Sequence, residues 1–322
     1  MPVTVETPIE KWNGKVREVT LGATKAEGGT RGRTVTVGGS ATLPFLHFEG
    51  EVPNRPVIAI QVQDIDPVDW APTLRAAWGD VTKDVVTWAQ KAVELGADII
   101  ALNLRSAHPD SGNKGPDDIA QTVKNVLAAV DVPLIIYGPG VPDKDNEVLV
   151  RAAEVAAGER IAIGVAEQNN YRTIVAACLA NGQIAIAKAP IDVNIQKQIN
   201  ILMNDMGLPL DRILMDPTTG ALGYGIEYVY SVMERLRLSA LGGDGMTQMP
   251  TICTVGDEAW RAKESKVGEG VPEAWGDLTE RGVIWETITA STLLQAGADI
   301  LVLRHPRTVE NVKKIVDQMM VK

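Results

Sequence analysis

The sequence is poor in the residues on which many functional sites depend. Only two cysteines, Cys178 and Cys253, and three histidines occur in 322 residues. Two thiols cannot hold a four-thiolate iron–sulfur cluster, and two cysteines within apolar stretches do not indicate a disulfide framework. The histidines stand outside any H-E-x-x-H or Cys/His motif, so the sequence predicts no metal site.

A surplus of positive charge is also missing. The chain has 31 basic and 41 acidic residues and a formal net charge of −10, which repels phosphate backbones and anionic lipid surfaces. The N-terminus lacks the pattern of a signal peptide, and no apolar run reaches the ~18 residues that a membrane span needs. We therefore expect a cytoplasmic protein that binds neither nucleic acid nor membranes.

From residue 57 onward, short runs rich in Val and Ile alternate with amphipathic helical patterns. Several of these patterns, such as residues 84–96 and 282–297, end in glycine, which favours helix termination. The runs are apolar almost throughout, as is typical of parallel strands buried on both faces. The expected strands are residues 57–64, 97–104, 133–140, 160–167, 183–190, 212–217, 250–257 and 298–305.

Eight βα units predict an α/β fold, a (β/α)8 TIM barrel over residues 57–322. An open doubly wound sheet is the alternative, because it differs by only one βα unit.

Residues 1–56 do not follow this alternation of strands and helices. Alternation in residues 16–22 and 33–39 predicts a β-hairpin-like N-terminal extension. We expect it to plug the bottom of the barrel; an arm that reaches a partner is the alternative.

Tryptophans gather in two connections at the expected C-terminal rim. The connection after the seventh strand has ~25 residues, beyond the ~12–15 at which loops tend to be functional. It carries Trp260 and Trp275, and the segment after the first strand carries Trp70 and Trp78. Exposed tryptophan is enriched in interface cores. These side chains therefore either form an interface or pack the loops onto the barrel.

Residues 213–237 combine an apolar strand, an Asp-Pro turn, three glycines and a long helix. We expect the three glycines, Gly220, Gly223 and Gly225, to turn the backbone with positive φ. The N–H groups of the helix that follows would then point to the rim, where they suit an anion or an amide-bearing ligand. A purely structural tight turn is the alternative.

The other strand ends offer hydrogen-bonding groups more than catalytic groups. Lys188 would form a Schiff base if burial lowered its pKa, but an ion pair with Asp192 or another rim carboxylate is favoured. His305 would serve as a base, yet no Ser or Cys nucleophile stands next to it in the sequence. We therefore assign no catalytic residue.

Four long segments resemble one known family. These segments are similar to the small subunit of the corrinoid iron–sulfur protein of acetogenic and related anaerobes, the delta-type subunit of the acetyl-CoA synthase system. The likeness extends from about residue 16 to the C-terminus and is far more specific than a short motif. The segments are residues 21–64, 213–237, 249–264 and 293–306.

The resemblance implies a non-catalytic TIM-barrel subunit that forms a heterodimer with a larger subunit. That larger subunit carries a [4Fe–4S] cluster and a cobalamin domain, and the corrinoid lies between the two chains. The heterodimer accepts a methyl group from methyltetrahydrofolate through a separate methyltransferase and passes it to acetyl-CoA synthase in the reductive acetyl-CoA pathway. The rim residues expected to contact the corrinoid are Asn103, Gly138, Asn169, Lys188, Thr218, Gly220, Gly223, Tyr224, Gly225 and His305.

The residues agree with what the resemblance implies. With two cysteines, an iron–sulfur cluster has to be in the partner. The D-x-H-x-x-G pattern of cobalamin domains is absent, so no histidine is marked as a cobalt ligand. A rim of amides, glycines and aromatic side chains suits a large amide-fringed macrocycle. The competing functions are a free-standing pterin-dependent methyltransferase, with Asn103, Asn169, Asp192 and Asp216 at its rim, and a Schiff-base aldolase that uses Lys188.

Overall fold

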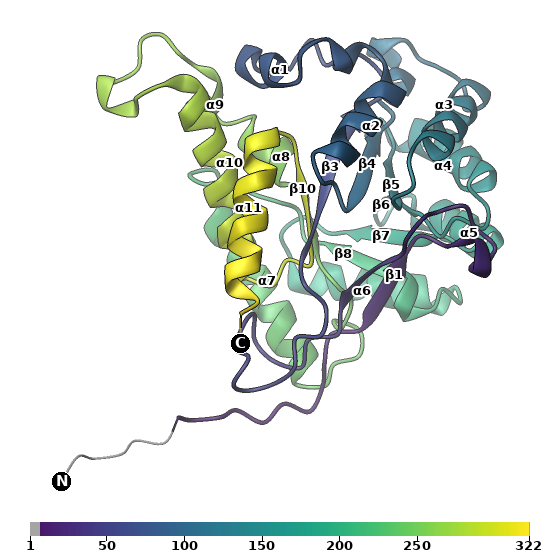
Figure 1. Ribbon diagram of the computed structural model, residues 1–322. Coiled ribbons are helices and arrows are strands. Elements are labelled where there is room, and N and C mark those ends of the chain that lie inside the picture. The colour runs from purple at the N-terminus through teal and green to yellow at the C-terminus, as the bar shows by residue number, and fades with distance from the viewer. Residues whose placement is uncertain (1–6, 322) are drawn as a thin grey trace.

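The computed structural model describes residues 7–321, and its main body is a ring of parallel strands surrounded by helices (Figure 1). The strands follow one another in the order β8-β7-β6-β5-β4-β3-β10-β9. All eight expected strands are present, so the predicted barrel is confirmed. They are β3 Val57–Gln63, β4 Ile99–Asn103, β5 Leu134–Tyr137, β6 Ala162–Ala166, β7 Ile184–Lys188, β8 Ile213–Asp216, β9 Ile252–Cys253 and β10 Ile300–Leu303.

The ring closes between β8 and β9. Met215 pairs with Thr251 in a parallel bridge, and the Met215 N–H donates to the Pro250 carbonyl at 2.8 Å. β9 has only two residues where the sequence predicted residues 250–257, because the chain turns into a helix at Val255. The closed ring excludes the open doubly wound sheet.

Helices cover the outside of the ring, and seven of the eleven α-helices in the described residues begin at a start signal in the sequence. Proline stands at the start of α1, α3, α4 and α11, and aspartate side chains cap α2, α6 and α10. The helices are α1 Pro72–Trp78, α2 Val85–Glu94, α3 Pro116–Ala129, α4 Pro142–Val155, α5 Tyr171–Asn181, α6 Val193–Asp205, α7 Ile226–Leu241, α8 Val255–Ala259, α9 Lys263–Lys266, α10 Leu278–Gln295 and α11 Pro306–Met319. None of the helices in residues 7–321 is long and apolar enough to cross a membrane.

The N-terminal extension forms an antiparallel hairpin of β1 Glu18–Leu21 and β2 Val35–Gly38 (Figure 1). Its apolar side chains share one buried cluster with the residues that open the barrel strands, such as Val57, Ile99 and Ile300. Because the amino ends of the strands form the bottom of a barrel, the hairpin fills that end. The plug interpretation is therefore correct for the hairpin.

The connection between the two hairpin strands is held to the barrel by a buried ion pair. Arg31 Nε lies 2.7 Å from Glu159 Oε2, and the two side chains are 1% and 9% exposed. The Arg31 guanidinium also donates to the carbonyls of Leu127 and Val130, each at 2.6 Å. Thr30 donates to Glu159 through its N–H and its hydroxyl. Every charged group in this cluster is thus paired, which burial requires.

Three of the four rim tryptophans pack the loops onto the barrel. Trp70 and Trp78 both meet the buried Trp88 edge to face, with ring centroids 5.3 and 5.7 Å apart. Trp260 is 3% exposed, whereas Trp275 keeps part of its surface in solvent. The long connection that carries the last two also contains α8 and α9. Of these four rim tryptophans, only Trp275 is available for an interface.

We predict that Arg31→Ala lowers the free energy of unfolding by ~3–5 kcal/mol, because it leaves Glu159 as a buried carboxylate without its cation. Urea denaturation measures the change. Arg55→Ala is the matched control, since the Arg55–Asp317 pair is 52% and 62% exposed and should contribute less than ~1 kcal/mol. Equal losses for the two variants would show that the buried pair does not hold the hairpin in place.

Candidate functional site

Polar side chains meet at the carboxyl ends of the barrel strands, the end at which TIM barrels bind ligands. Four of the strands that end on such a residue contribute it to one cavity. Asn103 of β4 stands in register with Tyr137 of β5, and Lys188 of β7 stands in register with Asp216 of β8. They line a cavity of ≈ 210 Å³, here called the mouth cavity, together with Gly138, Asp145 and Asp257.

Asp216 is a buried carboxyl at the end of β8, with 2% of its surface exposed. The N–H of Thr218 donates to its Oδ1 at 2.9 Å. Burial raises the pKa of Asp216 to about 6, and the nearby Lys188 ammonium opposes that rise. Thr218 has a positive φ of 64°, and its hydroxyl donates to the Ala189 carbonyl at 2.7 Å. This tight turn fixes the position of the Asp216 carboxyl.

Asp145 of α4 is a second buried carboxyl at the cavity and was missed in the sequence. It is 4% exposed and accepts the Gly140 N–H at 3.0 Å, and burial raises its pKa to about 6. A Cβ on Gly138 would lie 2.2 Å from Asp145 Oδ1, so only glycine allows this approach. The available signal was an acidic residue in the first helical turn after a Gly-Pro-Gly strand end.

Two polar atoms at the mouth cavity are buried without a partner among the described residues. They are Asn103 Oδ1 and the Tyr137 hydroxyl. Burial keeps the pKa of Tyr137 well above its usual value, with the Asp216 and Asp257 charges contributing, so the hydroxyl is neutral. Buried polar atoms nearly always have a hydrogen-bond partner. These two atoms therefore mark positions at which a bound group would donate and accept hydrogen bonds.

Lys188 lies at the rim beside a carboxylate, as the favoured interpretation expected. Its Nζ is 3.8 Å from Glu167 Oε1. Asp192 is not the partner, because its Oδ1 accepts the N–H groups of Asn194 and Ile195 and caps α6. Lys188 also borders a neighbouring cavity of ≈ 360 Å³ that contains Asn169.

Arg304 follows β10 and lines a neighbouring cavity of ≈ 190 Å³, which shares Asn103 and Asp257 with the mouth cavity. Its Nε donates to Gln61 Oε1 at 3.0 Å, it bonds the Asp257 carboxylate, and its guanidinium lies 4.6 Å from the centroid of the Trp70 ring. Glu286 of α10, fully buried, accepts the Arg304 N–H at 2.6 Å. Glu286 could not be singled out from the sequence, because its neighbours on the helix give no sign of its strand-end partners.

His305 is not brought to the mouth cavity. It is 2% exposed and stacks on Trp260, with ring centroids 5.7 Å apart and planes 14° apart. Its Nδ1 accepts the Arg307 N–H at 3.1 Å, which caps α11. Burial lowers the pKa of His305 to about 4, so the ring is neutral near pH 7. Its position is that of a helix cap behind the rim.

The glycine bend after β8 contacts the long connection that contains α9. Gly223 and Gly225 have positive φ, 73° and 92°, as expected, but Gly220 does not. The expectation for Gly220 was wrong: a Cβ there would lie 2.9 Å from the Gly225 backbone, so close approach requires the glycine. Tyr224 is 51% exposed, and its hydroxyl donates to Glu264 at 3.0 Å.

The backbone donors of the bend are partly used within the chain. The Tyr224 N–H donates to the Ala221 carbonyl at 2.9 Å, and the Leu222 N–H donates to Thr289 Oγ1 of α10 at 3.3 Å. Of the ten residues expected to contact the corrinoid, three line the mouth cavity: Asn103, Gly138 and Lys188. Thr218 donates its N–H to Asp216, which lines the same cavity. Asn169 lines the neighbouring cavity. The bend and His305 support the surrounding structure. No cluster of three metal-ligating side chains occurs in residues 7–321.

We predict that Asp216→Asn stabilises the protein above pH 6. The folded-state pKa is about 6 and the unfolded value is ~4, so the wild-type residue favours folding most below pH ~4, and this contribution is lost as pH rises through 6. At pH 8 the free energy of unfolding should be roughly 2–3 kcal/mol higher in the variant, with little difference at pH 4. Urea denaturation at both pH values measures this, with the exposed Asp211→Asn as control. A variant with no pH-dependent gain would contradict the raised pKa.

Comparison with solved structures identifies the fold class. The dihydropteroate synthase of Xanthomonas albilineans, solved with indole-2-carboxylic acid and 6-chloroguanine, aligns with a TM-score of 0.57 over 83% of this chain and 94% of that chain, at 16% identity. The Coxiella burnetii dihydropteroate synthase, solved with pteroic acid, aligns with a TM-score of 0.57 over 87% of this chain, at 14% identity. At these identities the likeness concerns the fold alone.

Comparison of sequences is more specific. A family model for the CO dehydrogenase/acetyl-CoA synthase delta subunit matches residues 18–316. The acetyl-CoA decarbonylase/synthase complex subunit delta of Methanosarcina mazei is 41% identical over 97% of this chain and 72% of the relative. The subunit of the same name from Archaeoglobus fulgidus is 40% identical over 96% of this chain and 70% of the relative. The chain therefore belongs to the family of CO dehydrogenase/acetyl-CoA synthase delta subunits.

Proposed function

We propose that this chain is the non-catalytic barrel subunit of a corrinoid methyl carrier, and that its mouth covers a cobalamin held by a larger partner subunit. Its relatives are named as subunits of the acetyl-CoA decarbonylase/synthase complex, which supports a function within a multi-subunit complex. Its two cysteines are both buried and are too few for a four-thiolate cluster, so the [4Fe–4S] cluster is carried by the partner. The methyl group comes from methyltetrahydrofolate through a methyltransferase and leaves to acetyl-CoA synthase.

The size of the mouth cavity supports a covering role over an enclosing one. Its ≈ 210 Å³ is below the ~300–1,000 Å³ typical of pockets that enclose a small ligand. A corrin macrocycle therefore does not fit inside, but it can lie across the rim. Amide side chains at its edge would then enter the cavity to meet the unpartnered Asn103 Oδ1 and Tyr137 hydroxyl. This pair of unpartnered atoms is the observation that carries the proposal.

The residues of this chain position the corrinoid and exclude water from it. When bound, the corrinoid supplies the cobalt centre that carries the methyl group. Asp216 and Asp145 have pKa values of about 6, so they exchange protons close to neutral pH. Lys188 is held beside Glu167. A cover of this kind limits the access of solvent to a reactive centre while partner domains move.

A pterin-dependent methyltransferase is the second candidate. The dihydropteroate synthases that share the fold were solved with pteroic acid and other heterocycles, and here Asn103 and Asp216 border one cavity. An amide and a carboxyl can bind the edge of such a ring through paired hydrogen bonds. Under this alternative, the isolated chain would bind methyltetrahydrofolate tightly and transfer its methyl group.

We predict that purification of this chain from its native source, without tags, yields a red-brown heterodimer that contains cobalt and iron. Metal analysis and the visible absorption spectrum measure both metals. The isolated chain should bind methyltetrahydrofolate weakly in calorimetric titration and show no methyl transfer. A colourless homodimer, or tight folate binding with turnover by the isolated chain, would overturn the carrier role.

We predict that Asn103→Ala weakens corrinoid retention by the assembled heterodimer by about tenfold, because a buried hydrogen bond is worth ~1–1.5 kcal/mol. The measurement is release of cobalamin during dialysis, followed by absorbance. Asn125→Ala, on the exposed face of α3, is the matched control and should release cobalamin at the wild-type rate. If both variants retain cobalamin equally, the mouth does not contact it.

A further inference from the structure

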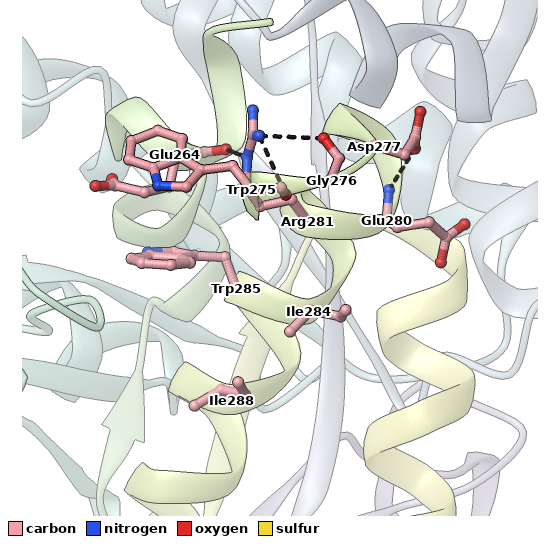
Figure 2. A pocket seen from close by; sticks show the side chains of 9 residues that line it. All are labelled: Glu264, Trp275, Gly276, Asp277, Glu280, Arg281, Ile284, Trp285 and Ile288. Carbon is pink, nitrogen blue, oxygen red and sulfur yellow. Dashed lines mark hydrogen bonds between the residues drawn. The ribbon is translucent and has the colours of Figure 1, made fainter. Parts of the chain in front are cut away.

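A second candidate surface lies on the outer side of α10, apart from the mouth cavity. A groove of ≈ 460 Å³ runs between the start of α10 and the segment that precedes it (Figure 2). Figure 2 shows the indole of Trp275 above that of Trp285, on the same side, with Ile284 and Ile288 following along the helix. We call this surface the α10 groove. The proposed function makes no use of it.

Arg281 holds the wall of the α10 groove in place. It is 8% exposed and donates to the carbonyls of Val267 at 2.6 Å, Trp275 at 3.4 Å and Glu264. Its guanidinium also lies 5.1 Å from the centroid of the Trp275 ring. All of these contacts are made within the chain. The groove is therefore formed in advance, and a partner need not order it on binding.

The floor of the α10 groove is apolar and uncovered. Ile284 and Ile288 are one helical turn apart, so they share a face of α10, and they are 51% and 40% exposed. Trp285 Nε1 is buried without an acceptor among the described residues, so this N–H is not presented on the surface. The surface thus offers an apolar contact, which apolar side chains of a partner would cover.

Charge narrows the choice of occupant. The α10 groove is lined by the carboxylates of Glu264, Asp277 and Glu280 and by one guanidinium, that of Arg281. Arg307 pairs with Glu280 at 2.6 and 2.8 Å. The carboxylates of Glu264 and Asp277 then outnumber the Arg281 guanidinium by one, so the groove keeps one net negative charge. A second copy in a two-fold dimer would bring the same acidic patch against itself. A basic partner meets no such repulsion.

We propose that the α10 groove binds a polypeptide segment of another subunit of the complex, one that presents apolar side chains beside a lysine or arginine. The apolar side chains cover Ile284 and Ile288. The basic side chain of the segment faces Glu264. The family's membership of a multi-subunit complex supplies such partners. The proposal does not depend on a corrinoid.

Hydroxyl-radical footprinting of the isolated chain and of the purified complex tests this proposal. We expect labelling of Trp285, Ile284 and Ile288 to fall several-fold in the complex. Leu238, 46% exposed on α7 and outside the groove, is the internal control and should keep its labelling. Unchanged labelling of the groove in the complex would overturn the proposal. Protection that appears in the isolated chain as its concentration rises would identify a second copy and also overturn it.

Substitutions separate a partner contact from a structural role. Ile288→Asp should weaken assembly of the complex by about tenfold or more, and Leu238→Asp should leave it unchanged. Glu264→Gln keeps an acceptor for Tyr224 but should reduce the salt dependence of assembly. Light scattering and circular dichroism of each isolated variant confirm that it folds as the wild type does. If the Ile288→Asp variant assembles into the complex as tightly as the wild type, the proposal is overturned, whether or not the complex retains cobalamin.

Discussion

Closure of the barrel at its weakest strand pair governs the rest of the structure. β9 has two residues, and the contact between β8 and β9 rests on the Met215–Thr251 bridge and the hydrogen bond from Met215 to Pro250. Asp299 reinforces this point: its Oδ2 accepts the Thr251 N–H at 2.8 Å, and its N–H donates to the Thr251 carbonyl at 2.9 Å. Because the ring closes, all strand carboxyl ends face one mouth.

Closure also explains why the mouth contains groups that burial disfavours. Asp216 and Asp145 lie at positions where desolvation raises their pKa values, although a neutral side chain of the same shape would fit there with less cost in stability. Residues that lower stability in this way tend to lie at functional sites. Burial raises the pKa of Glu286 as well, but three N–H groups, those of Arg304, His305 and Trp260, donate to this carboxyl. Glu286 therefore has a structural role.

One connection forms part of both candidate surfaces. Residues 255–277 contribute Asp257 to the mouth cavity and Trp275 to the α10 groove. The bend after β8 supports the same connection, because Tyr224 bonds Glu264 through its hydroxyl. A chain bound in the groove would therefore lie against a segment whose other end borders the mouth. The connection is longer than an ordinary barrel loop because it contributes residues to both surfaces.

The sequence by itself determined the eight strands, the hairpin and the family, because apolar periodicity and long matching segments are local properties of the chain. It also indicated Asn103, Gly138 and Lys188 as residues at strand ends. Only the tertiary structure decided that Asp145 meets Gly138, that Glu167 and not Asp192 lies beside Lys188, and that His305 turns away from the mouth. Those contacts join residues from separate βα units, and the direction of a side chain at a strand end depends on the ring's packing, which no local pattern records.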